Sequence, residues 1–258
     1  DENLLKMAVL VGILAQLVDG ALGMAYGTTA TTFLLYNGTP PALATASVHI
    51  AEIFTTAASG LGHWHKGNID KKLFLSLVVP GTIGGLLGVL VVVNIDGEAL
   101  RPWMAGYLLL MGSYIIYKAL KKRKFWNEAF QKIRIFKKKQ QRRIIPLALL
   151  GGFLDSAGGG GWGPVVTTTL LGSGHEPKTA IGSVNAAEFF ITVATGFSFA
   201  LLVGVAQWEI PAGLIIGGVI TAPLAVHITS RLPANILMLV VGVLICTLSA
   251  FTIYRAII

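Results

Sequence analysis

Four acidic residues lie inside apolar segments of the sequence, where a charge is costly: Asp19, Glu52, Asp155 and Glu188. A charged side chain at the centre of a membrane helix costs about 2.5–3.5 kcal/mol on insertion scales. Such groups can carry protons through a membrane protein, or they can accept hydrogen bonds from neighbouring backbone and side chains. Both roles, proton coupling and a structural role, remain open for all four acids.

Two of these acids each begin a glycine-rich segment. The first reads Asp-Gly-Ala-Leu-Gly-Met-Ala-Tyr-Gly over 19–27, and the second reads Asp-Ser-Ala-Gly-Gly-Gly-Gly-Trp-Gly-Pro over 155–164. We expect a helix to break in each segment and a new helix to begin after it, with Pro164 in the first turn, where proline is tolerated. The free N–H groups at a helix start carry a partial positive charge and can bind an anion without Lys or Arg. The alternative role of the glycines is close helix packing.

This chemistry predicts an anion site made by two helix starts that face each other near the membrane midplane. His49 and Asn185 occupy equivalent positions one turn before Glu52 and Glu188, and either could donate to a ligand. Because a carboxylate repels an anion, we expect the acids to point away from the site or to be protonated. The predicted substrate-binding residues are Gly23, Ala25, Tyr26, Gly27, Thr28, His49, Gly159, Gly160, Gly161, Trp162, Gly163 and Asn185.

The composition indicates a membrane protein. Hydrophobic residues make up 54% of the 258 residues and charged residues only 12%, against about 25% charged residues in soluble domains. Twelve of the 20 Lys and Arg residues fall within 118–143. Between apolar segments, such a basic block indicates a cytoplasmic loop rather than a nucleic-acid site. A soluble enzyme and a disordered chain are excluded, and the single Cys246 excludes an internal disulfide.

The elements that would position the site are long apolar helices. Spans are expected at Pro41–Leu61, Leu73–Val93, Pro102–Leu120, Thr179–Val203, Ile210–Ile228 and Ala234–Tyr254. The segments Leu4–Tyr36 and Ile144–Leu171 contain the glycine breaks, and each arm beside a break is expected to have only about 10–15 residues. Since about 20 residues are needed to cross a bilayer, we expect each broken segment to enter the membrane and return as a re-entrant hairpin.

The two halves of the sequence are related. With a constant offset of 136, nearly half of the 42 positions in Asp19–Gly60 are identical to those in Asp155–Gly196. Loop charges give the two copies opposite orientations in the membrane, as in many secondary transporters; a parallel repeat with eight simple crossings is the alternative. The predicted fold is an all-α integral membrane protein with two inverted repeats, each a broken or re-entrant helical hairpin plus three transmembrane helices. The predicted parts are a first repeat at 1–120, a basic cytoplasmic linker at 121–143 and a second repeat at 144–258.

At the glycine-rich segments 19–27 and 152–164 the chain resembles the TauE/SafE sulfite exporter family, and the resemblance extends over both halves. It implies a transporter that exports sulfite or an organosulfonate across the cytoplasmic membrane, which the chain would cross several times. Proton coupling would fit the buried acids. A passive anion channel and a transporter of another small organic anion are the alternatives.

The expected partners are a small anionic substrate, the lipid bilayer and a second copy in a homodimer, with no nucleic acid. We expect no enzyme activity, no cofactor and no metal, because no nucleophile–base motif and no ligand set with suitable spacing is found in the sequence.

Overall fold

The computed structural model describes residues 2–22, 24–120, 141–173, 175–204, 207–229 and 234–258. Within these ranges the chain is helical and contains no strand. The predicted basic linker at 121–143 lies outside the described residues except for its last three, which begin a helix. The helices of the first half are α1 (Glu2–Leu22), α2 (Tyr26–Tyr36), α3 (Pro41–His65), α4 (Lys71–Asn94) and α5 (Gly97–Leu120). Those of the second half are α7 (Gln141–Gly158), the π-helical turn η1 (Gly163–Thr167), α8 (Thr168–Gly172), α9 (Pro177–Leu202), α10 (Glu209–Thr229) and α11 (Ala234–Ile257).

The helices α3, α4, α5, α9, α10 and α11 agree with the six expected spans. Both expected breaks are present as well, between α1 and α2 and between α7 and η1. The expected arm length is wrong for the first arm of each hairpin, because α1 has 21 residues and α7 has 18. The helix α1 continues through Gly20 to Leu22. A single glycine costs a helix only about 1 kcal/mol, so it does not end α1 by itself.

The distribution of side chains is that of a membrane protein. Large apolar residues such as Leu75, Val79 and Leu90 on α4 are more than half exposed. Polar residues such as Thr28, His49 and Asp155 are buried in the interior. Among the described residues, stretches of α4, α9 and α11 are long and apolar enough to cross a bilayer. An apolar surface around an interior that holds these polar groups is stable in lipid rather than in water.

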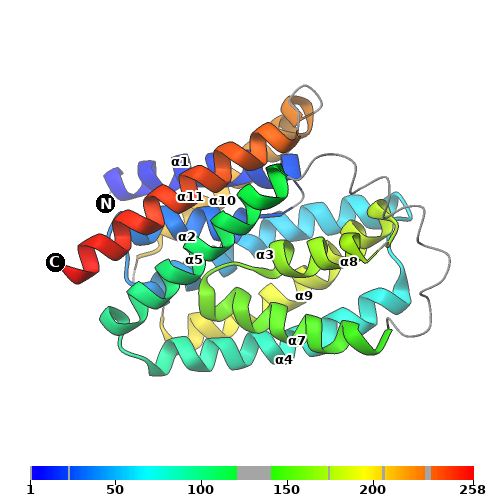
Figure 1. Cartoon of the computed structure of the whole chain (residues 1–258), viewed down its shortest axis with the longest axis horizontal. Helices are drawn as coiled ribbons and strands as arrows, with labels where there is room; N and C mark the ends of the chain where they lie inside the picture. Colours follow the sequence, from blue (N-terminus) through cyan, green and yellow to red (C-terminus); the bar gives the residue numbers. More distant parts are fainter. Residues whose placement is uncertain (1, 23, 121–140, 174, 205–206, 230–233) are drawn as a thin grey trace.

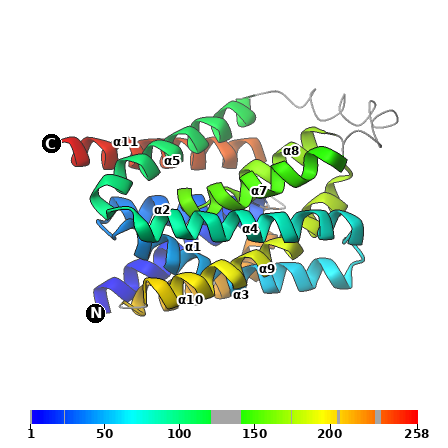
Figure 2. The ribbon, with the colours of Figure 1, turned by 90° about the horizontal axis from the view of Figure 1, so that it is seen from below.

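The two halves pack reciprocally, as Figures 1 and 2 show. The first helix of each half lies against the third long helix of the other half: α1 packs on α10, and α7 packs on α4. Equivalent helices also pack on each other, α3 on α9 and α5 on α11. Each half therefore completes the other, and the two broken hairpins are held between helices of both halves.

Small residues allow the close approach of α4 to α7. A Cβ atom added at Gly84 of α4 would overlap the backbone carbonyl of Leu149 on α7, and one at Gly88 would lie 2.8 Å from the Cβ atom of Ser156. Such contacts between backbones are the usual basis of helix association in lipid, where there is little hydrophobic driving force between helices. The packing places the end of α7, and the break that follows it, deep inside the molecule.

Candidate functional site

Each break depends on backbone conformations that side chains rarely adopt. In the first half, Ala25 before α2 has a φ of 82°, in the left-handed region. In the second half, Gly159 has a φ of 78° and Gly160 has a φ of 132°. The region around Gly160 is accessible essentially only to glycine. Among the described residues of the two breaks, the left-handed conformation is thus adopted by Ala25 in the first and by Gly159 and Gly160 in the second.

The two breaks touch each other in the interior. A Cβ atom added at Gly160 would overlap the backbone nitrogen of Thr28, at the start of α2. A Cβ atom added at Gly27 would lie 3.0 Å from the Cα atom of Gly160. The glycines therefore let the backbone of the second break lie directly against the first turn of α2.

A carboxylate caps the second break. The Oδ1 atom of Asp155 accepts hydrogen bonds from the backbone N–H groups of Gly161 at 2.8 Å and Trp162 at 2.9 Å. The first half has an equivalent bond, because the backbone N–H of Tyr26 donates to the carboxylate of Asp19. Tyr26 and Trp162 are related by the offset of the repeat. Hydrogen bonds of this kind fit the structural role that was one of the two possibilities for Asp19 and Asp155, that of accepting bonds from neighbouring backbone groups.

A third carboxylate reaches the first break from α3. The backbone N–H of Gly27 donates to the Glu52 side chain, and a Cβ atom at Gly27 would lie 2.8 Å from its Oε1 atom. Of the two alternatives expected for the acids, pointing away from the site is therefore wrong for Asp19, Asp155 and Glu52, and protonation stays a prediction. Free N–H groups at a helix start attract the nearest anion, and here that anion is a carboxylate of the protein itself.

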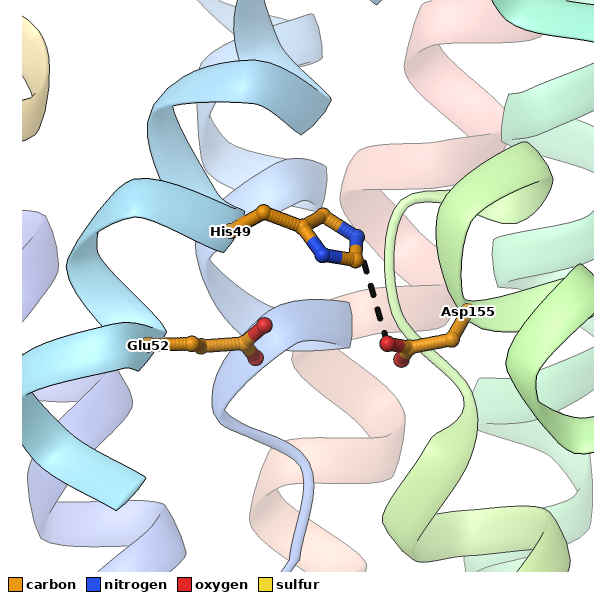
Figure 3. A group of neighbouring side chains, drawn as sticks. All are labelled: His49, Glu52 and Asp155. Atoms are coloured by element: carbon orange, nitrogen blue, oxygen red, sulfur yellow. Dashed lines mark ion pairs between the residues drawn. The ribbon is translucent and has the colours of Figure 1, made fainter. Parts of the chain in front are cut away.

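His49, Glu52 and Asp155 form a buried cluster, and Figure 3 shows their side chains pointing toward one another from α3 and α7. Each side chain offers one nitrogen or oxygen atom of the kind that can bind a metal ion, and these three atoms lie within 4.8 Å of one another. The His49 Nε2 atom is 3.9 Å from Asp155 Oδ2. The three residues are at most 3% exposed. His49 Nε2, Glu52 Oε2 and Asp155 Oδ2 have no hydrogen-bond partner, so each presents an unused polar atom to the cluster.

Hydroxyl groups without partners lie around the same breaks. A Cβ atom at Gly161 would overlap the Tyr107 hydroxyl, and one at Gly159 would lie 3.0 Å from Thr31 Oγ1. Neither hydroxyl has a hydrogen-bond partner. Other buried hydroxyls without partners are those of Thr29, Thr45, Ser47, Ser156, Thr167 and Ser249. Buried polar atoms normally have partners, so the free hydroxyls of Tyr107 and Thr31 beside the second break indicate a place where a polar ligand or water can bind.

Some predicted site residues have their side-chain donors engaged elsewhere. The Tyr26 hydroxyl donates to the backbone carbonyl of Leu214, and the Trp162 indole N–H donates to that of Val184. The Asn185 amide donates to Ser59 Oγ at 2.7 Å. The donors of Tyr26 and Trp162, and one N–H of the Asn185 amide, are therefore already used in this state. Gly163 lies against Met24, while Gly23 lies outside the described residues.

The structure adds residues that sequence reasoning missed, chiefly Tyr107, Thr31 and Thr195. Thr195 Oγ1 lies 2.8 Å from His49 Nδ1, on a helix of the other half. Tyr107 lies on α5, 54 positions before Gly161 in the chain. The sequence indicated only that a tyrosine or threonine inside an apolar span needs a partner for its hydroxyl. It did not indicate where in the fold that partner lies.

A cleft lies next to the second break. It is mainly apolar, has a volume of about 340 Å³ and lies among α4, α5 and α7. Tyr107 and Gly158 line one part of it, and Val91, Leu100 and Phe153 line other parts. The cleft therefore reaches the helix end from which the glycine break begins.

The fold and the site together define a class of protein: a helical membrane protein with broken helices that meet in a polar interior, the arrangement of membrane transporters. The comparisons agree. The model of the family described as "Sulfite exporter TauE/SafE" matches residues 8–252, so the chain belongs to this family. It is 39% identical over 246 residues to the "Probable membrane transporter protein YtnM" of Bacillus subtilis (strain 168), covering 94% of this chain and 80% of the relative. No solved structure matches. The chain is thus a membrane transporter and not an enzyme.

Proposed function

We propose that this transporter exports a small sulfur-containing anion, sulfite or an organosulfonate, across the cytoplasmic membrane. The family supports the substrate class, since its model is described as a sulfite exporter. The observation that carries the proposal is the contact of the two broken helices at Gly27, Thr28 and Gly160, beside hydroxyl groups that have no partner.

The carboxylates at the breaks indicate how the site binds an anion. A carboxylate and an oxyanion such as sulfite offer the same kind of acceptor oxygen. The N–H groups that hold Asp155 and Glu52 in this state can therefore hold a substrate oxygen when a carboxylate moves away. The free hydroxyls of Tyr107 and Thr31 would complete the shell of donors. Hydrogen bonds to charged acceptors are about twice as strong as neutral ones, so a few such donors can replace a basic side chain.

The movement would be a rocking of the two halves about the breaks. The reciprocal packing of α1 on α10 and of α7 on α4 supports this arrangement. In Figure 1, α1 and α7 run in opposite directions, as inverted repeats would. With inversion, the same site can open to one side of the membrane and then to the other.

A cation is expected to move with the anion. Every Lys and Arg side chain that the structure describes lies in a loop or within five residues of a helix end. The polar interior therefore contains carboxylates without a described basic side chain beside them. An anion entering beside carboxylates is repelled unless positive charge enters too. The proton is the proposed coupling ion, because the buried carboxylates can bind it.

The cleft beside Tyr107 supports the organosulfonate form of the proposal. Its apolar walls suit the carbon chain of a sulfonate whose head group lies at the second break. Sulfite has no such chain and needs only the polar part of the site. If the cleft takes part, short alkylsulfonates should compete with sulfite better as the chain grows, until the cleft is full.

Radiolabelled sulfite flux into proteoliposomes tests the proposal. The expected result is a flux that saturates with sulfite, responds to an imposed pH gradient and is inhibited by short alkylsulfonates. Flux that rises linearly with sulfite and follows voltage alone would favour the channel alternative. Absence of sulfite flux, with transport of an unrelated organic anion, would reject the substrate class.

A further inference from the structure

The tautomer of His49 follows from its neighbour on α9. The Thr195 hydroxyl donates its hydrogen to the backbone carbonyl of Ile191 at 2.9 Å. The same oxygen lies 2.8 Å from His49 Nδ1. With the single hydroxyl hydrogen on the Ile191 carbonyl, Thr195 accepts the second bond and His49 Nδ1 carries a hydrogen. In the neutral ring, His49 Nε2 then has a lone pair.

That lone pair faces other lone pairs. His49 Nε2 lies 3.9 Å from Asp155 Oδ2, and Glu52 supplies a third atom within the same 4.8 Å cluster. None of the three unused atoms has a hydrogen-bond partner. Acceptors that converge in a buried place repel one another, so the arrangement needs a proton or a metal cation among them. One nitrogen and two carboxylate oxygens are the ligand types of a divalent transition metal.

We propose that His49, Glu52 and Asp155 bind a divalent transition metal ion, with Zn²⁺ as the prototype. Two charges on the metal would balance the Glu52 and Asp155 carboxylates, beside which no Lys or Arg is described. Two ligands of tetrahedral Zn²⁺, each about 2.0–2.1 Å from the metal, lie about 3.3 Å apart. A shift of about half an ångström between His49 and Asp155 therefore closes the observed gap.

The surroundings of the cluster resemble those of known metal sites. A ligating histidine usually has its second nitrogen held by a hydrogen bond, which orients the ring, and Thr195 does this for His49. Asp155 is likewise fixed by two backbone N–H groups on its other oxygen. Three protein ligands leave a fourth position open, which water or an oxygen of the substrate anion can occupy.

The site would connect the two halves of the transporter. His49 and Glu52 lie on α3 of the first half, and Asp155 lies on α7 of the second. A metal bound to all three would hold α3 and α7 together at the point where the breaks meet. Bound Zn²⁺ is therefore expected to raise the thermal stability of the protein and to slow its transport cycle.

The test is direct metal binding by the full chain in detergent. The protein is stripped with a chelator, equilibrated with ZnCl₂ and analysed for bound zinc and for thermal stability. We expect one Zn²⁺ per chain and a rise in melting temperature. The substitutions His49→Gln and Glu52→Gln should each weaken binding at least tenfold. His63→Gln is the matched control, because His63 lies on α3 but bonds with Asn68 at the helix end, and it should bind zinc as the wild type does.

Two results would overturn the metal site: no zinc bound by the stripped wild type, or zinc binding lost in His63→Gln and kept in His49→Gln. A Co²⁺-loaded sample adds a check that does not depend on stability, since its visible spectrum should change in His49→Gln. Sulfite flux is measured separately in zinc-free liposomes. Zinc binding without sulfite flux would reject the proposed substrate but not the metal site. Sulfite flux without zinc binding would reject the metal site but not the proposed substrate.

Discussion

Replacing Gly160 with alanine is the sharpest perturbation of the paired breaks. The φ of 132° at this position strains any side chain by about 1–3 kcal/mol. The added Cβ atom would also overlap the backbone of Thr28 and Gly27, and overpacking costs about 1–3 kcal/mol. Together the two effects amount to roughly 2–6 kcal/mol, unless the breaks move apart.

The assay compares thermal unfolding in detergent with sulfite flux in liposomes. At roughly 2–4 °C per kcal/mol, the melting temperature of Gly160→Ala should fall by about 10 °C, and sulfite flux should be lost. Gly106→Ala is the matched control, since a Cβ atom there meets nothing within 4 Å and alanine favours a helix by about 1 kcal/mol. A Gly160→Ala protein that melts and transports like the wild type would refute the contact of the two breaks.

Three further perturbations test other parts of the site. Asp155→Ala leaves two buried N–H groups without an acceptor, at about 1–3 kcal/mol each. It should therefore melt well below Asp155→Asn, which keeps an acceptor oxygen, and equal melting temperatures would contradict the capping role. Tyr107→Phe removes a hydroxyl without a partner, so stability should hold while the KM for sulfite rises about tenfold; an unchanged KM would exclude Tyr107 from the site. Cysteines at the equivalent exposed positions Asn37 and Ser173, in a Cys246→Ser background, should react from opposite sides of the membrane, and reaction from one side would exclude inverted repeats.

The sequence was sufficient to predict the helices and the breaks, because apolar length and glycine are local signals. Six spans and two broken segments agree with the helix bounds. The lengths of the first arms could not be predicted, because α1 continues through Gly20. Whether one glycine ends a helix depends on packing against α10, which local sequence does not reveal.

For the candidate site, the sequence predicted that the two breaks meet. It did not decide which groups the free N–H groups of the breaks bind. Gly27, Thr28 and Gly160 meet as the paired breaks require. The use of the free N–H groups by Asp155 and Glu52 was one of two roles left open, because a sequence does not show where a carboxylate points. No metal site was expected from the sequence, since His49 and Asp155 are 106 positions apart and only the packing of α3 near α7 brings them together.

We propose that a sulfur oxyanion is held where the two broken helices meet. Anomalous diffraction from crystals grown with selenite, a heavier analogue of sulfite, is the decisive measurement. We expect one strong selenium peak beside Thr28 and Gly160, within hydrogen-bond reach of the Tyr107 hydroxyl. A peak elsewhere in the protein, or no peak in crystals of a protein that transports selenite with saturation, would contradict it.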